Sequence, residues 1–193
     1  AVAALGLILT VTGRFDAAVA HFDDAFRRSC EEGDGAFASG IAYDQADLAL
    51  VRGDLAGARE WSGRAMAFGP EVVADLSRLA ENLRSHALAS ALAGELGEAL
   101  RSIDRAADVA AKGWMRNAVN IQRMQAWLWL ELGRRDLALR QLATLAQRDD
   151  LLPGERLAID ATRVYAGDPA TDPAAMLEAA AACEDLLIRC RVL

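Results

Sequence analysis

Residues 53–65 read GDLAGAREWSGRA, and the same pattern of small and large residues returns three more times along the chain. GRFDAAVAHFDDA begins at Gly13, GELGEALRSIDRA at Gly94 and GRRDLALRQLATL at Gly133. Gly167 follows a fifth apolar run, so successive glycines are 40, 41, 39 and 34 residues apart. A period of about this length is typical of proteins built from stacked structural repeats.

Three columns of the repeat hold small residues, counted from the glycine of each unit. The column seven residues before the glycine contains Gly6, Ala46, Ala87 and Ala126. The column five residues after it contains Ala18, Ala58, Ala99 and Ala138, and the column twelve after it contains Ala25, Ala65, Ala106 and Leu145. Because small side chains let helices approach closely, these columns predict helical hairpins in which the glycine makes the turn.

Larger side chains occupy the column nine residues after the glycine, namely Phe22, Ile103 and Leu142. We expect them to fill the gap between the two helices of each hairpin, because protein interiors are close-packed. The second unit has Ser62 in this column, which fits less well, and we expect the neighbouring Trp61 to compensate.

Breakers and apolar spacing predict ten helices, near residues 1–12, 15–31, 36–52, 55–68, 71–93, 96–112, 115–132, 135–148, 154–166 and 173–191. We therefore expect an all-α fold, a right-handed superhelix (α-solenoid) of five antiparallel helix pairs in a single domain. The predicted units are 1–33, 34–70, 71–113, 114–152 and 153–193. The last is degenerate and has the character of a cap, because Asp160 replaces the small residue and prolines interrupt GDPATDPAAM.

The charge of the chain argues against some classes of partner. Among its 193 residues 53% are hydrophobic, the net charge is −7, and Lys112 is the only lysine. Phosphate binding requires clustered positive charge, so we expect no direct contact with nucleic acid and none with anionic membranes. If DNA is involved, another domain should contact it.

The three cysteines, Cys30, Cys183 and Cys190, are odd in number and include no close pair. A disulfide framework is therefore not expected, and a reducing, cytoplasmic compartment is the natural interpretation. No apolar run reaches 18 residues, the length typical of a membrane span. The chain begins at Ala1 rather than Met, and we expect it to be a segment of a longer polypeptide.

Four features recur in these units: the small residue in the first helix, the turn glycine, the apolar residue two positions later at Phe15, Leu55 and Leu96, and the following alanines. Together they resemble the tetratricopeptide repeat (TPR) over residues 1–150. The longer period and repeats such as RGDLAGAREWSGRAMA resemble the helical-repeat region of LuxR-type (MalT-like, ATP-dependent) bacterial transcriptional regulators. That resemblance implies an inducer-sensing repeat domain, with a nucleotide-binding module before it and a helix-turn-helix domain after it.

Each motif that could indicate a catalytic or ligand-binding site also has a purely structural interpretation. In the tripeptide Arg52-Gly53-Asp54 we expect a helix end, a turn and an N-cap rather than an adhesion loop. GDGAFASG, at 33–40, and GELG, at 94–97, lack the residues of a phosphate-binding loop. His86 is expected to be a hydrogen-bonded core imidazole. We predict no catalytic residues, metal site or cofactor, because no set of acids, bases or ligands converges.

Two columns of each first helix, ten and six residues before the turn glycine, line the concave face in tetratricopeptide arrays. Here they hold residues that mix arginine donors with apolar surface, namely Tyr43, Asp47, Arg84, Leu88, Arg123 and Trp127. Such a strip would suit an acidic peptide or a small anionic effector. The alternative is a groove that is exposed but unused, or filled by neighbouring segments.

The sequence therefore leaves two main functions open. The first is a noncatalytic ligand-sensing or protein-interaction domain of a bacterial transcriptional regulator, and the second is a general TPR scaffold that docks a peptide segment of a partner. An enzyme on a helical scaffold is disfavoured, because no site assembles. A repeat array with unsealed ends can also pair with a second copy of itself.

Overall fold

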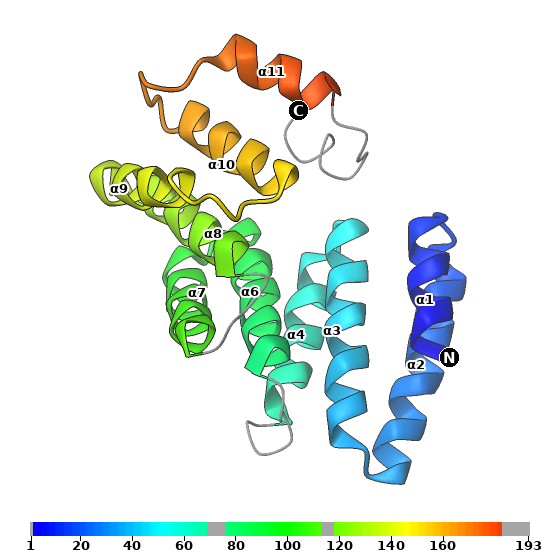
Figure 1. Cartoon of the computed structure of the whole chain (residues 1–193). Coiled ribbons are helices and arrows are strands. Elements are labelled where there is room, and N and C mark those ends of the chain that lie inside the picture. The colour runs from blue at the N-terminus through cyan, green and yellow to red at the C-terminus, as the bar shows by residue number, and fades with distance from the viewer. Residues whose placement is uncertain (1, 69–75, 113–117, 183–193) are drawn as a thin grey trace. The chain divides into compact units, whose positions relative to one another are not determined.

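The computed structural model describes residues 2–68, 76–112 and 118–182. These described residues form ten helices and no strand, which confirms the prediction of an all-α helical-repeat fold (Figure 1). The chain divides into two compact units, residues 1–117 and 118–193, and each is described by itself below.

Unit 1 consists of three helical hairpins. Its helices are α1 (Val2–Val11), α2 (Phe15–Glu32), α3 (Gly35–Val51), α4 (Leu55–Ala67), α6 (Leu76–Leu92) and α7 (Leu96–Ala111). The pairs α1 with α2, α3 with α4 and α6 with α7 form the hairpins, and α2 packs on α3 and α4 on α6. The first helices α3 and α6 of successive hairpins are also in contact, and the candidate site lies along this contact.

Unit 2 contains α8 (Ala118–Glu131), α9 (Arg135–Ala146), α10 (Pro153–Tyr165) and α11 (Pro173–Ala182). α9 packs on α8 and on α10, and α10 also contacts α8 and α11. All predicted helices are present, and their ends agree to within two residues wherever both lie in the described residues. The predicted starts at 1, 71 and 115 and the predicted end at 191 lie outside the described residues.

The turn glycines adopt the backbone conformation that the repeat predicts. Positive φ angles between 66° and 83° occur at Gly13, Gly53, Gly94, Gly133 and Gly167. A left-handed residue there costs glycine nothing, because it has no Cβ. Gly33, between α2 and α3, has the same conformation and was not recognised from the sequence, because it lies between units and outside the repeat column.

The Arg-Gly-Asp tripeptide has the predicted structural role. α3 ends with Arg52 as its C-cap, Gly53 makes the turn, and the Asp54 carboxylate accepts a hydrogen bond of 2.9 Å from the backbone N–H of Gly57. A carboxylate at this position satisfies a helix N–H that has no partner within the helix.

The small columns of the repeat are buried, as predicted. The side chains with no exposed surface include Ala18, Ala58, Ala99, Ala138, Ala46, Ala87 and Ala126. The larger column is buried as well, with Phe22, Ile103 and Leu142 all at 0% exposure and Ser62 at 1%. Trp61 is half-buried, and its ring packs edge-on against Phe26 with 5.2 Å between ring centroids.

Phe22 and Gly6 fit one another within the first hairpin. The Phe22 ring belongs to a core cluster with Leu9, Ile41 and Leu48. A Cβ built at Gly6 would overlap three atoms of that ring. Phe22, the bulkiest residue of the larger column, therefore packs against Gly6, the residue of the small column that has no side chain.

The mutation Gly6→Ala should destabilise the protein by about 1–2 kcal/mol, because overpacking a filled core costs about 1–3 kcal/mol and alanine recovers up to about 1 kcal/mol of helix propensity. Adding Phe22→Leu should cost less in the Gly6→Ala background than in the wild type, because leucine relieves the overlap. Urea unfolding followed by circular dichroism measures both. Gly63→Ala on α4 is the control, since no atom outside its own stretch of helix backbone lies within 4 Å of its Cβ position, and it should be neutral or stabilising. Additive effects of the two changes would contradict the fit.

Candidate functional site

Four of the six predicted groove residues lie on α3 and α6, two first helices that are in contact in unit 1. Tyr43 and Asp47 lie on α3, Arg84 and Leu88 lie on α6, and all four are half-buried. The helices that carry these columns in two successive repeats are thus neighbours.

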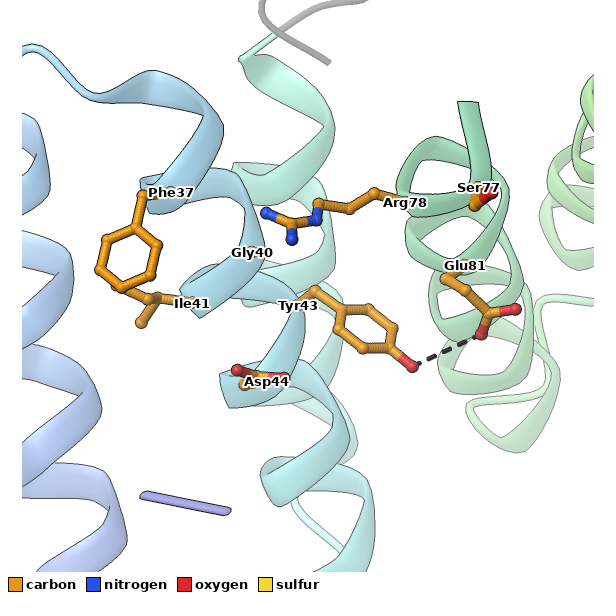
Figure 2. Close-up of a pocket in the computed structure, with 8 residues that line it drawn as sticks. All are labelled: Phe37, Gly40, Ile41, Tyr43, Asp44, Ser77, Arg78 and Glu81. Atoms are coloured by element: carbon orange, nitrogen blue, oxygen red, sulfur yellow. Dashed lines mark hydrogen bonds between the residues drawn. The ribbon is translucent and has the colours of Figure 1, made fainter. Parts of the chain in front are cut away.

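Arg84 is the centre of a hydrogen-bond network at this contact. Its Nε donates to Glu81 Oε2 at 2.8 Å, and its Nη2 donates to the Tyr43 hydroxyl at 3.4 Å. The Tyr43 hydroxyl in turn donates to Glu81 Oε2 at 3.4 Å (Figure 2). Only 21% of the Arg84 side chain and 13% of the Glu81 side chain are exposed. The guanidinium of Arg84 is therefore held by acceptors of the protein itself.

The pKa values of this network follow from burial and from the neighbouring charges. Burial alone would lower the pKa of Arg84, but Glu81, Tyr43 and Asp47 outweigh it and raise that pKa above the ordinary value. Burial, then the charge of Asp47, raises the pKa of Tyr43. At neutral pH the arginine stays charged and the tyrosine stays a neutral hydrogen-bond donor.

The remaining two predicted groove residues, Arg123 and Trp127, lie on α8 in unit 2 and are half-buried. Arg123 Nη1 donates to Thr162 Oγ1 on α10 at 3.4 Å. The arginine is thereby tied to the next helix pair of its own unit.

A pocket of about 280 Å³ lies between α3 and α6 (Figure 2). Its lining consists of apolar side chains from α3 and charged or polar side chains from both helices, namely Phe37, Gly40, Ile41, Tyr43, Asp44, Ser77, Arg78 and Glu81. Tyr43 and Glu81 belong to both the network and the pocket. The pocket is therefore continuous with the predicted groove residues of unit 1.

Arg78 crosses from α6 to α3 at the place where α3 has a glycine. Its Nη1 donates to the backbone carbonyl of Ala36 at 3.0 Å. A Cβ at Gly40 would meet the guanidinium, so the absence of a side chain there leaves room for this crossing. Arg78 has no other hydrogen bond and no ion pair among the described residues. As far as the described residues are concerned, its remaining N–H groups stay available at the pocket.

Asp44 is the least satisfied charge of the pocket. No hydrogen bond and no ion pair within 4 Å reaches its carboxylate from the described part of the chain. Burial, then the negative charge of Asp47, raises the pKa of Asp44 to about 6, although Arg78 opposes the shift. Ionised Asp44 is therefore a source of local instability at neutral pH.

The mutation Asp44→Asn should stabilise the protein at pH 8. Because the folded-state pKa is raised, the favourable contribution of Asp44 is fully present below about pH 4 and is lost as the pH rises through about 6. The shift corresponds to at most about 3 kcal/mol, and partial exposure reduces the expected gain to about 1–2 kcal/mol. Urea unfolding should show this gain at pH 8 and a much smaller one near pH 4. Asp16→Asn, at a side chain that is 99% exposed, should show no such difference.

The sequence interpretation missed Asp44, Arg78 and Glu81. The available signal was the spacing of Glu81 and Arg84, since residues three apart on a helix share a face and an acid there pairs with the arginine. Asp44 and Arg78 had no comparable signal, because their position depends on Gly40 and on the way the two helices pack.

His86 bridges α4 and α6 as a hydrogen-bonded imidazole, as the sequence predicted. Its Nδ1 lies 2.9 Å from Ser62 Oγ, and its Nε2 lies 3.7 Å from the Glu98 carboxylate. Burial lowers the pKa of His86, and the charge of Glu98 opposes that effect. Ser62 is 1% exposed and donates to the carbonyl of Arg59 at 3.1 Å, so this serine packs inside the hairpin stack.

The described residues contain no group of three or more His, Cys, Asp or Glu side chains placed to hold a metal ion. None of the described helices combines the length and the apolar character needed to cross a membrane. Cys30 is exposed, whereas Cys183 and Cys190 lie outside the described residues.

Solved structures with similar folds are TPR or TPR-like proteins. The TPR-like repeats of a Podosopora anserina protein assigned to the kinesin light chains match with a TM-score of 0.71 and 18% identity, covering 94% of this chain and 92% of that chain. A thermophilic TPR protein of Thermus thermophilus matches with a TM-score of 0.65 and 22% identity, covering 99% and 95%. YrrB, a TPR protein with an unusual peptide-binding site, matches with a TM-score of 0.57 and 16% identity, covering 98% and 88%.

At these identities the likeness concerns the fold alone. No protein-family model matches the chain, and no curated protein matches it in sequence. The chain therefore has a TPR-like arrangement of helical repeats, as its repeat columns predicted.

Proposed function

We propose that this chain is a noncatalytic interaction domain that binds a peptide segment of a partner protein. In unit 1 the binding residues are Tyr43, Asp47, Arg84 and Leu88, together with the adjoining pocket between α3 and α6. In unit 2 the equivalent columns hold Arg123 and Trp127, and we propose the same role for them.

The observation that carries this proposal is the pocket itself. It combines an apolar wall with charged groups that retain unused hydrogen-bonding capacity, and it adjoins the two columns that line the concave face in TPR arrays. Binding sites commonly have this composition, with a few polar groups fixing the orientation of a ligand on an apolar surface. YrrB, which shares the fold, is a TPR protein with a peptide-binding site.

A peptide array probed with the purified chain tests this function, followed by fluorescence anisotropy with the best hits. Leu88→Ala or Trp127→Ala should weaken binding about tenfold or more, since each removes apolar contact area without disturbing the Arg84–Glu81 pair. Leu137→Ala is the matched control, because Leu137 is 39% exposed and lies on α9, the second helix of its hairpin, outside the two groove columns. Circular dichroism confirms that each variant is folded. Unchanged binding in both test variants, or no binding peptide at all, would contradict the proposal.

A second candidate is the sensing domain of a LuxR-type, ATP-dependent bacterial transcriptional regulator. Support comes from the period of about 40 residues and from the alanine-, arginine- and leucine-rich repeats, and the ligand would be an inducer or a partner segment. The sequence of the complete gene tests this context. A nucleotide-binding module upstream and a helix-turn-helix domain downstream are expected, and a complete gene without either would overturn it.

A further inference from the structure

We propose that the pocket between α3 and α6 binds the side chain of an arginine or lysine of the partner segment, with its cationic end against the Asp44 carboxylate. This inference rests on the proposed function and specifies the chemistry of the ligand. It departs from the acidic ligand that the arginines of the sequence suggested.

The charges of the face favour a cation. Arg84 is already paired with Glu81 and hydrogen-bonded to Tyr43, so it offers little to an anionic ligand. Asp47 accepts a hydrogen bond of 2.9 Å from Ser85 Oγ. Asp44 has no such donor among the described residues, and the second oxygen of Glu81, Oε1, is buried without a hydrogen-bond partner there. Among the described residues, Asp44 and Glu81 Oε1 therefore lack hydrogen-bond donors, and the positive charge of Arg78 acts on Asp44 without a hydrogen bond or an ion pair.

The shape of the pocket fits a single long side chain. Its volume of about 280 Å³ falls just below the range of about 300–1,000 Å³ typical of pockets for drug-sized ligands. Phe37, Ile41 and the ring of Tyr43 provide apolar and aromatic surface, on which the methylene stem of an arginine or lysine can pack. A cation beside the tyrosine face gains a further favourable electrostatic contact.

Arg78 accounts for the choice of a peptide over a free amine. It enters the pocket from α6 with one N–H group fixed on the Ala36 carbonyl, and Asp44 enters from α3 (Figure 2). The other N–H groups of Arg78 can donate to a backbone carbonyl of the ligand while the ligand side chain reaches Asp44. A charged group held in this way positions the peptide backbone, and Asp44 selects the side chain.

The net charge of the chain points in the same direction. At −7 it attracts a basic segment and repels an acidic one, which favours the encounter with a cationic partner. A lysine or arginine that displaces water from Asp44 also supplies the partner that this carboxylate lacks among the described residues.

The test uses positional-scanning libraries of acetylated hexapeptides, with fluorescence anisotropy to the purified chain. One position is fixed in turn as arginine, lysine, citrulline, norleucine or glutamate. Citrulline has nearly the shape of arginine without its charge. We expect the best binders to contain arginine or lysine, and exchanging that residue for citrulline should weaken binding about tenfold or more.

The mutation Asp44→Asn should remove this preference, so that arginine and citrulline peptides bind it equally, while Asp16→Asn on α2 should retain it. If wild-type protein binds peptides but shows no preference for the basic residue, or if Asp44→Asn retains that preference, the inference is overturned and the peptide-binding function stands. If no hexapeptide binds the wild type, the inference falls together with the proposed function.

Discussion

Replacing Phe22 by alanine should reduce the free energy of unfolding by about 3–5 kcal/mol, the largest effect expected of any single truncation in unit 1. The ring has no exposed surface and packs against Leu9, Ile41 and Leu48 from two other helices. Alanine would lose the transfer free energy of the ring and leave a cavity between α1 and α2. The absence of a side chain at Gly6 enlarges that cavity, because no neighbouring methyl group can fill it.

Urea unfolding of Phe22→Ala, followed by circular dichroism, measures this loss. Phe37→Ala is the matched control, because the same truncation is made at a side chain that is 41% exposed. The control should lose about 1 kcal/mol or less, since surface substitutions have small effects. An equal loss in the two variants would show that the ring does not fill the core of the hairpin.

The second large effect is expected for Glu81→Gln. This change removes the charge that partners Arg84, whose side chain is only 21% exposed, and leaves the guanidinium without the carboxylate to which it is hydrogen-bonded. Breaking a buried ion pair on one side costs about 3–5 kcal/mol, and the residual exposure of this pair reduces the expected loss to about 2–3 kcal/mol. The double variant Glu81→Gln, Arg84→Met should recover part of that loss, because it removes the unpaired charge.

The control for this pair is Glu60→Gln on α4. Glu60 forms an ion pair of 2.6 Å with Arg64, but the two side chains are 62% and 47% exposed. Exposed pairs contribute about 0–1 kcal/mol, so the same chemical change should have little effect there. Equal losses of unfolding free energy in Glu81→Gln and Glu60→Gln would mean that burial does not determine the cost of breaking an ion pair.

The fold could be predicted because its determinants are local and recur. A left-handed glycine, a buried alanine and a larger buried side chain recur at fixed offsets, so four imperfect copies of the repeat predict the same structure. The capping role of Asp54 could be predicted for the same reason, because one turn of chain determines it. Gly33 was missed, although its conformation is the same, because no other unit repeats it.

The candidate site could be predicted only in part. Offsets from the glycines placed Tyr43, Asp47, Arg84 and Leu88 on adjoining helices, and the structure has them there. The sequence could not show that Glu81 neutralises Arg84, because pairing depends on burial and rotamer as well as on spacing. The pocket itself depends on Gly40 and Arg78 from helices of different hairpins, and a repeat column carries no information about such contacts.

The match of Phe22 with Gly6 also bears on how a chain of similar repeats keeps its order. In the next three units, alanine takes the place of Gly6, and serine, isoleucine or leucine takes the place of Phe22. If α2 paired with the first helix of one of these units, its phenylalanine would meet a methyl group. If α1 paired with another second helix, a void would remain. Side-chain volume thus identifies the proper partner for each of these two helices, so hairpins that share a backbone are not interchangeable within the chain.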